Sequence, residues 1–283
     1  MPVVFPIVVV LGLALVVGIT VLGARQREQL EDQYRQICLD HGLAATDTPL
    51  GTSDQWLAQF ELLPKGDRDH SAVWGMEGPA EVTIGGETVP VECAAFEWWW
   101  EDRQTDNSGN GHTRTTWVRK SCMAALVRLP APWVMPKVRL EREGLFARFG
   151  IGGRGDFQVE SEEFNKRYDV RVRDPQAAIR LFDADFQQQM LGLFDGTAFE
   201  LAGDLALVVT DTPKGTMVVS SNARRGGASG LAALFSRSGD RIRTDPAIVQ
   251  ALPTTRQRAL ALLRAMPDGW WRAVARPDGG GAL

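Results

Sequence analysis

The first residues of the chain form an apolar run that limits what the rest can be. Residues 3–24 contain no Asp, Glu, Lys, Arg or His and are rich in Val and Leu. A transmembrane helix needs ~20 mostly apolar residues to cross a hydrocarbon core of ~30 Å, and this run meets that length. The sequence therefore predicts a transmembrane anchor over residues 1–24.

A cleaved secretory signal is the alternative interpretation of this run. Such a signal carries a basic segment before its apolar core, whereas only Met1 and Pro2 precede the run here. Small residues are also required before the cleavage site, and a cut after Ala24 would place the bulky Leu22 at one of those positions. The uncleaved anchor is the favoured interpretation.

Basic residues flank the run on its C-terminal side. Arg25, Arg27 and Arg35 follow it, and only the α-amino group precedes it. Because segments rich in Lys and Arg stay in the cytoplasm, we expect a single-pass protein of the cell membrane, with its N-terminus outside and its main domain cytoplasmic. Arg25 and Arg27, together with Arg224 and Arg225 further along, are candidates for contact with anionic lipid headgroups. A solvated flexible segment is the alternative for the second pair.

Small residues within the run indicate where a second helix could pack. Ala14 and Gly18 form one small-xxx-small step, and Gly12 adds another small position. Small side chains let two helices approach closely in lipid, where packing drives association. These three residues are the predicted contact with an integral membrane protein partner.

The charge and the cysteines exclude several classes of protein. A formal net charge of -4 argues against nucleic acid as a partner, because a surface that binds a duplex is strongly basic. Cys38, Cys93 and Cys122 are far apart and lack the spacing of a zinc site or a disulfide framework. Reduced thiols suit a cytosolic domain. We predict no metal site, no cofactor and no nucleic acid partner.

The patterns that follow the run predict an α+β domain. Residues 25–45 are predicted to form a juxtamembrane helix. Residues 46–220 contain segments that alternate apolar and polar residues between Gly- and Pro-rich turns, which predicts a mostly antiparallel sheet with packed helices. One of these helices is expected to start at Asp174-Pro175 and to run over residues 176–194, and Ser161 is expected to cap a short helix over residues 162–167. Residues 221–283 are predicted to be a linker, a C-terminal helical segment with its helix over residues 254–266, and a flexible tail.

Two long strands are predicted at the centre of this domain. The pair Gly85-Gly86 lies between alternating apolar segments and is typical of a two-residue hairpin turn. Residues 89–101 form the strand that follows this turn, and residues 113–129 form the strand that returns from a polar loop. Helices or a second sheet are expected to cover both faces.

Tryptophan is unusually frequent in this chain. There are nine Trp against two Tyr. Trp is enriched at the surfaces where proteins dock. Trp98 and Trp100 share one face of the first central strand and Trp117 lies on the second, so these three are the predicted protein docking residues.

Several motifs in the middle of the chain resemble those of a known family. They are FEWWW at residues 96–100, VRLP at residues 127–130, ESEEFN at residues 160–165 and YDV at residues 168–170. In these the chain resembles an uncharacterised family of bacterial proteins, chiefly actinobacterial. The resemblance implies one N-terminal membrane span and a cytosolic α/β domain, and it transfers no catalytic residue.

No constellation of residues predicts a catalytic centre. Residues 150–155 fit G-x-G-x-x-G, but residues 156–160 read as a strand where the dinucleotide fingerprint requires a helix. The three histidines have no companion at ligand spacing. Glu97 and Glu101 would lie ~13 Å apart along one strand, too far to act as acid and base on one bond. We therefore name no catalytic residue.

These observations lead to a main hypothesis and to alternatives. The main hypothesis is a membrane-anchored, non-catalytic binding or scaffolding protein, an accessory subunit of a larger membrane complex of respiratory or transport type. The first alternative is a small-ligand sensor or enzyme that uses a pocket in the sheet domain, and a purely structural role is the second. Burial of the three Trp side chains would remove the docking argument, and a concave pocket with convergent polar groups would favour the first alternative.

Overall fold

The computed structural model describes most of the chain after the predicted anchor. The described residues are 21, 24–25, 28–67, 69–108, 112–142, 157–211 and 246–274. The chain divides into two compact units, Met1–Leu43 and Ala44–Leu283. In the first unit, residues 28–40 are helical, whereas Ala44 and Ala45, at the end of the helix predicted over residues 25–45, are part of strand β1 (Ala44–Thr46).

The predicted anchor lies outside the described residues apart from Val21 and Ala24, which are helical. Within the part of the chain that the structure describes, no helix combines the length and the apolar character needed to cross a bilayer. The predicted helix-packing residues Gly12, Ala14 and Gly18 also lie outside that part.

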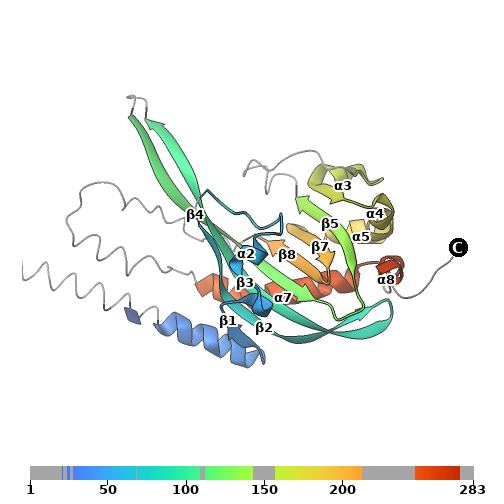
Figure 1. Ribbon diagram of the computed structural model, residues 1–283, viewed down its shortest axis with the longest axis horizontal. Coiled ribbons are helices and arrows are strands. Elements are labelled where there is room, and N and C mark those ends of the chain that lie inside the picture. The colour runs from blue at the N-terminus through green and yellow to red at the C-terminus, as the bar shows by residue number, and fades with distance from the viewer. Residues whose placement is uncertain are drawn as a thin grey trace, which may run out of the picture. The chain divides into compact units, whose positions relative to one another are not determined.

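An eight-stranded antiparallel sheet forms the centre of the second unit (Figure 1). Its strand order is β1-β2-β3-β4-β8-β7-β5-β6. The strands are β1 (Ala44–Thr46), β2 (His70–Ile84), β3 (Glu87–Ser108), β4 (His112–Arg128), β5 (Met135–Arg142), β6 (Tyr168–Val172), β7 (Thr197–Gly203) and β8 (Leu205–Thr210). The sheet and its helices confirm the predicted α+β class.

Strands β2 and β3 form the predicted hairpin. Ile84 pairs with Glu87, and the two residues between them make the turn. Gly85 and Gly86 have φ values of 57° and 85°. A two-residue turn of this kind requires positive φ at both positions, which glycine adopts at little cost. Local turn chemistry therefore determined the hairpin.

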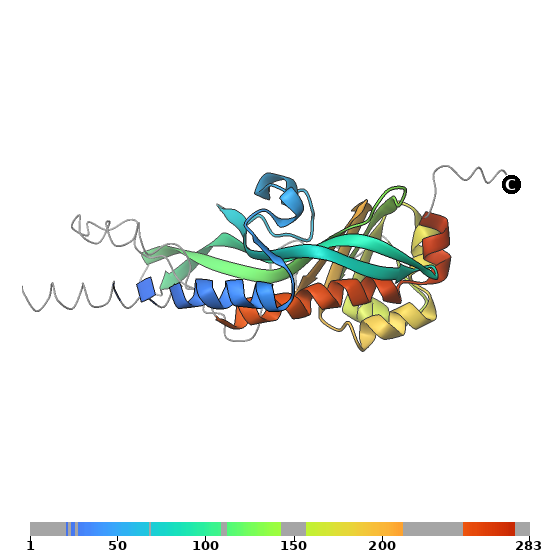
Figure 2. The same cartoon turned by 90° about the horizontal axis from the view of Figure 1, so that it is seen from below.

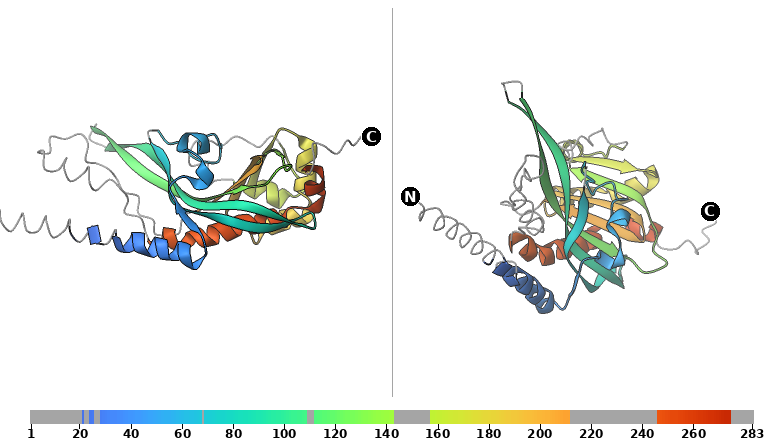
Figure 3. Two further views of the ribbon diagram at one scale, coloured as in Figure 1. Left: turned by 60° about the horizontal axis from the view of Figure 1, so that its bottom comes forward. Right: turned by 60° about the vertical axis from the view of Figure 1, so that its left-hand side comes forward.

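The hairpin of β3 and β4 extends beyond its neighbours. β2 pairs with β3 as far as Trp100, and β8 pairs with β4 only from Met123 toward Arg128. β3 and β4 remain paired with each other as far as Ser108 and His112. Figures 1 and 3 show this part of the hairpin projecting past the other strands.

Helices cover both faces of the sheet. They are η1 (Pro49–Gly51), α2 (Asp54–Leu57), α3 (Glu162–Arg167), α4 (Pro175–Leu181), α5 (Ala184–Leu191), α7 (Pro246–Ala265) and α8 (Asp268–Val274). Figure 2 shows α2 on one side of the sheet and α7, α4 and α5 on the other. α7 packs against β2, β3, β4 and β8, so the C-terminal helical segment belongs to the same compact unit as the sheet.

The single helix predicted over residues 176–194 is wrong. The structure has two helices, α4 and α5, because Phe182 leaves the helical conformation with φ -95° and ψ 54°. Asp183 then caps α5, and its Oδ1 accepts a hydrogen bond of 2.8 Å from the backbone N–H of Phe186. A short carboxylate competes with a continuous helix because it can satisfy a backbone N–H at a new helix start. The predicted helix start at Asp174 and the predicted cap at Ser161 are confirmed.

Helix α7 begins at Pro246, earlier than the predicted start at Thr254. It also covers the free edge of β2, whose pairing with β1 ends at Glu77. Two arginines of α7 donate hydrogen bonds to carbonyl groups of β2: Arg256 to Gly78 (3.1 Å) and Pro79 (2.8 Å), and Arg264 to Glu81 (2.8 Å). The carbonyls of Pro79 and Glu81, two residues apart, lie on the free edge of β2 and would otherwise be available to another strand.

Candidate functional site

The predicted docking residues Trp98 and Trp100 lie in the core. Their side chains are 0% and 3% exposed. Trp98 Nε1 donates to the carbonyl of Pro64 at 2.8 Å, and Trp100 Nε1 donates to the Asp102 carboxylate at 3.2 Å. A side chain buried in its own domain cannot present a docking surface, so this prediction is wrong for both. Trp117 is half-buried on β4, and its docking role stays a prediction.

The segment around α2 is what covers these tryptophans. Its apolar side chains form one cluster with the aromatic face of β3 and with small and aliphatic residues of β4, β7 and β8. The buried members contributed by this segment are Leu57, Ala58, Phe60, Leu62 and Leu63. They were visible in the sequence as an apolar group, but their position on the Trp face depends on tertiary packing.

Charged side chains continue this face of the sheet on β5 and β7. We call Glu61, Lys137, Arg139, Glu141 and Glu200 the charge cluster. Lys137 Nζ lies 2.6 Å from Glu61 Oε1 and 3.5 Å from Glu200 Oε1. Arg139 forms ion pairs with Glu61 and with Glu141. Arg139 Nε lies 2.6 Å from Glu141 Oε1, but the geometry of this contact is not that of a hydrogen bond.

The charge cluster attaches the segment after α2 to the sheet. Glu200 is 1% exposed, and its Oε2 accepts hydrogen bonds from the backbone N–H groups of Glu61 (2.7 Å) and Leu62 (3.1 Å). Burial raises the pKa of Glu200 and of Glu141, whereas the hydrogen bond from Lys137 lowers the pKa of Glu61. Buried carboxylates that are already bonded to cations and backbone groups serve structure, because no reactant can reach them.

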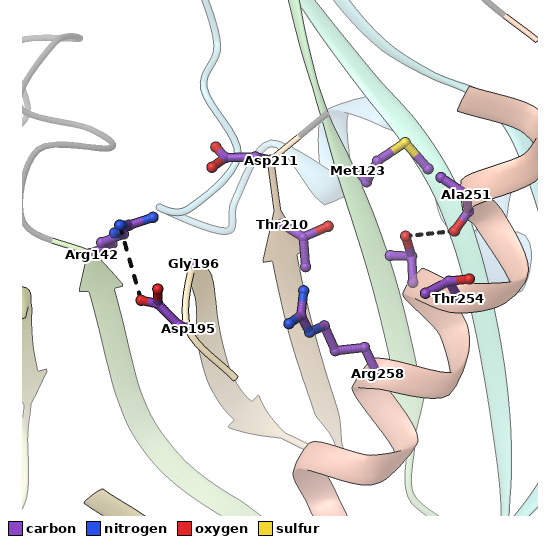
Figure 4. A pocket seen from close by; sticks show the side chains of 10 residues that line it. Met123, Arg142, Asp195, Gly196, Thr210, Asp211, Ala251, Thr254 and Arg258 are labelled. Carbon is purple, nitrogen blue, oxygen red and sulfur yellow. Dashed lines mark hydrogen bonds and ion pairs between the residues drawn. The ribbon is translucent and has the colours of Figure 1, made fainter. Parts of the chain in front are cut away.

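A cavity with both polar and apolar lining lies on the opposite face of the sheet, between α7, the middle of β4 and the ends of β5, β7 and β8 (Figure 4). Its volume is about 300 Å³. The residues that line it are Met123, Arg142, Asp195, Gly196, Thr210, Asp211, Ala251, Thr254, Thr255 and Arg258. We call it the α7 cavity.

Regular secondary structure brings these side chains together. Ala251, Thr254, Thr255 and Arg258 follow one another at i, i+3, i+4 and i+7, so they share one face of α7. On the sheet, Thr210 pairs with Met123 in the middle of β4 and with Thr197 at the start of β7, which places the end of β8 between these two strands at one side of the cavity. The floor is buried, while Asp195, Asp211 and Thr254 are at its exposed rim.

The cavity presents hydrogen-bonding groups of both kinds. Arg258 Nη2 donates to the carbonyl of Leu193 at 3.1 Å, and a guanidinium has further N–H donors. Figure 4 shows this side chain reaching from α7 toward Thr210. Thr255 Oγ1 donates to the carbonyl of Ala251 at 3.0 Å, which leaves its oxygen free to accept.

The arrangement is suited to binding. The residues that line the cavity include no His or Cys. Burial raises the pKa of three carboxylates, and none of them lines the cavity: Glu97, Glu141 and Glu200. Among the described residues there is also no group of three or more His, Cys, Asp or Glu that could hold a metal ion.

The remaining predicted site residues are not assembled into a site. Arg25 is exposed on its helix, and Arg27, Arg224, Arg225 and residues 150–155 lie outside the described residues. The headgroup contacts therefore stay a prediction.

The three cysteines are free thiols, as expected, and all are buried. Burial raises the pKa of Cys93 to about 12 and raises the pKa of Cys122 further. Thiols protonated at neutral pH are poor nucleophiles, so these residues serve as small apolar core groups.

Sequence reasoning missed the α7 cavity. The C-terminal helix was predicted, but its polar residues Thr254, Thr255 and Arg258 form no recognisable motif. Arg142 and Thr210 come from strands far from α7 in the sequence, and no local motif links them.

Comparison with known proteins adds no functional information. No family model, curated protein or solved structure matches the chain. The resemblance to the actinobacterial family of single-span proteins stays a prediction, and the functional argument depends on the α7 cavity.

Proposed function

We propose that the protein is a single-pass membrane protein whose α+β domain binds a small polar ligand in the α7 cavity and acts as a ligand sensor. One observation carries this proposal: Thr254, Thr255 and Arg258 of α7 meet Thr210, the last residue of β8, and the following Asp211 around one cavity. Ligand sites are typically concavities of ~300–1,000 Å³ with a few polar groups that orient the ligand. At about 300 Å³ the α7 cavity suits a ligand at the small end of that range.

The apolar run at residues 3–24 supports the membrane anchor in this proposal. The basic residues that follow it support an N-terminus outside the cell and a cytoplasmic main domain. In this arrangement Arg25 and Arg27 are positioned to contact the headgroups of the inner leaflet, and a cytoplasmic ligand has access to the cavity.

The accessory-subunit hypothesis has lost one of its supports. Two of the three Trp residues assigned to docking are buried, so the remaining support is the anchor with its small residues Gly12, Ala14 and Gly18. The α7 cavity supports ligand binding directly. We therefore prefer the ligand-sensor hypothesis to the scaffolding hypothesis.

Thermal unfolding of the full-length protein in detergent tests the proposal. The wild type is screened against small carboxylates, amino acids, amines, sugars and nucleotides. Thr254→Trp places a large side chain at the rim of the α7 cavity. Gln257→Trp is the matched control, because Gln257 is an exposed residue of the same helix that does not line the cavity.

We expect at least one compound to raise the Tm of the wild type and of Gln257→Trp but not of Thr254→Trp. Binding to the folded state stabilises it by about 2.7 kcal/mol when the free ligand is at 100 times its Kd. If no compound stabilises the wild type, or if Thr254→Trp responds equally, the cavity is not the binding site and the proposal is wrong.

A further inference from the structure

The α7 cavity contains four charged side chains that differ in how they are paired. Arg142 Nη2 lies 4.0 Å from Asp195 Oδ1, so these two charges compensate each other. Arg258 and Asp211 have no ion-pair partner within the described part of the chain, and they do not pair with each other. Among the described residues, Arg258 is thus a positive group and Asp211 a negative group of the cavity without an ion-pair partner.

The positive side of the cavity is arranged for a carboxylate. The carbonyl of Leu193 holds one nitrogen of the Arg258 guanidinium at 3.1 Å, which orients the group. The remaining N–H groups of a guanidinium form a planar fork that matches two carboxylate oxygens. Thr210 and Thr254 supply hydroxyl donors nearby, one buried and one at the rim.

The negative side of the cavity excludes some anions and favours a cation. Asp211 directly follows Thr210 at the end of β8, and Asp195 lines the opposite side. A phosphate group, with close to two negative charges, would be repelled by the Asp211 carboxylate. An ammonium group would compensate Asp211 and donate hydrogen bonds to it.

We infer that the ligand is a small zwitterion of the amino-acid class, with its carboxylate on Arg258 and its ammonium group on Asp211. The inference depends on the proposed function and names the ligand class of the same site. The volume of about 300 Å³ is at the small end of the range for ligand sites (~300–1,000 Å³), which suits an amino acid.

Isothermal titration calorimetry on the full-length protein in detergent tests the inference. The twenty common L-amino acids are titrated first. The tightest binder is then compared with its amine analogue, which lacks the carboxylate, with its carboxylate analogue, which lacks the ammonium group, and with inorganic phosphate. We expect each analogue to bind at least about tenfold more weakly than the amino acid, because each loses one charge-assisted contact.

Two variants assign the contacts. Arg258→Gln should bring the affinities of the amino acid and its amine analogue to within about threefold, and Asp211→Asn should do the same for the amino acid and its carboxylate analogue. Arg258→Lys keeps the charge and should retain part of the discrimination, which separates a binding effect from a folding effect. Arg272→Gln is the control, because Arg272 is an exposed residue of α8 that does not line the cavity.

The possible failures are distinguishable. If a single-charge analogue or phosphate binds as tightly as any amino acid, and Thr254→Trp abolishes that binding, the zwitterion inference is overturned and the proposed function stands. If no compound of any class binds in a way that Thr254→Trp blocks, both are overturned. If Arg258→Gln or Asp211→Asn still binds the amino acid about tenfold more tightly than the corresponding analogue, the assignment of the carboxylate to Arg258 and of the ammonium group to Asp211 is also overturned.

Discussion

Replacement of Glu200 by alanine removes the acceptor that joins the segment after α2 to the sheet. The carboxylate is 1% exposed, and its Oε2 accepts from the backbone N–H groups of Glu61 at 2.7 Å and Leu62 at 3.1 Å. A buried donor left without a partner costs ~1–3 kcal/mol, so two of them cost about 2–6 kcal/mol. Burial raises the pKa of Glu200, and removal of this charge offsets part of the loss. We expect Glu200→Ala to lower the free energy of unfolding by about 2–4 kcal/mol.

Urea unfolding followed by Trp fluorescence measures this change, with Glu200→Gln as the matched control. The glutamine amide oxygen can accept the same two hydrogen bonds, so this variant should stay within about 1 kcal/mol of the wild type. Hydrogen exchange at the amides of Glu61 and Leu62 gives a local measurement, and both should lose protection only in Glu200→Ala. Equal stability of the two variants would refute the reasoning, because the hydrogen bonds at Glu200 would then contribute nothing.

Three further changes have defined outcomes. Burial raises the pKa of Glu97, so the folded chain holds this proton more tightly than the unfolded chain, and stability falls as pH rises through the raised pKa. Glu97→Gln should flatten that decline above the ordinary carboxyl pKa of ~4.3, by at most about 1.4 kcal/mol per pH unit, in urea titrations at each pH. Gly66→Ala places a methyl group 2.6 Å from the backbone oxygen of Glu101 at a φ of +65°, and its urea midpoint should show a loss of at least about 2 kcal/mol. Asp183→Ala removes the cap on Phe186 N–H and should cost about 0.5–2 kcal/mol in the same assay, and an unchanged midpoint would rule out the cap as a source of stability.

Local chemistry allowed much of the fold to be predicted. The turn at Gly85 and Gly86 and the caps at Ser161 and Asp174 depend on residues within a few positions of one another. The single predicted helix over residues 176–194 failed for a reason of the same local kind, since the cap at Asp183 was read as an interior residue. Side-chain alternation along β3 was also correct, because it follows from strand geometry alone.

The candidate site could not be predicted in this way. The docking assignment of Trp98 and Trp100 failed because the segment that buries them comes from before β2 in the sequence. The α7 cavity was missed because its groups lie on β5, on β8 and on α7, and the stretch from Asp211 to Arg258 contains no motif that joins them.

The amino-acid sequence by itself determined the elements whose signals are short-range: the apolar run, the hairpin turn, the alternation of the central strands and the helix caps. Only the tertiary structure decided which faces these elements bury and which polar side chains converge. The physical reason is that helix and strand periods specify the faces of one element, while the partner of each face is set by packing between distant segments. Arg258 thus reads as an ordinary surface residue of a helix until the end of β8 is placed beside it.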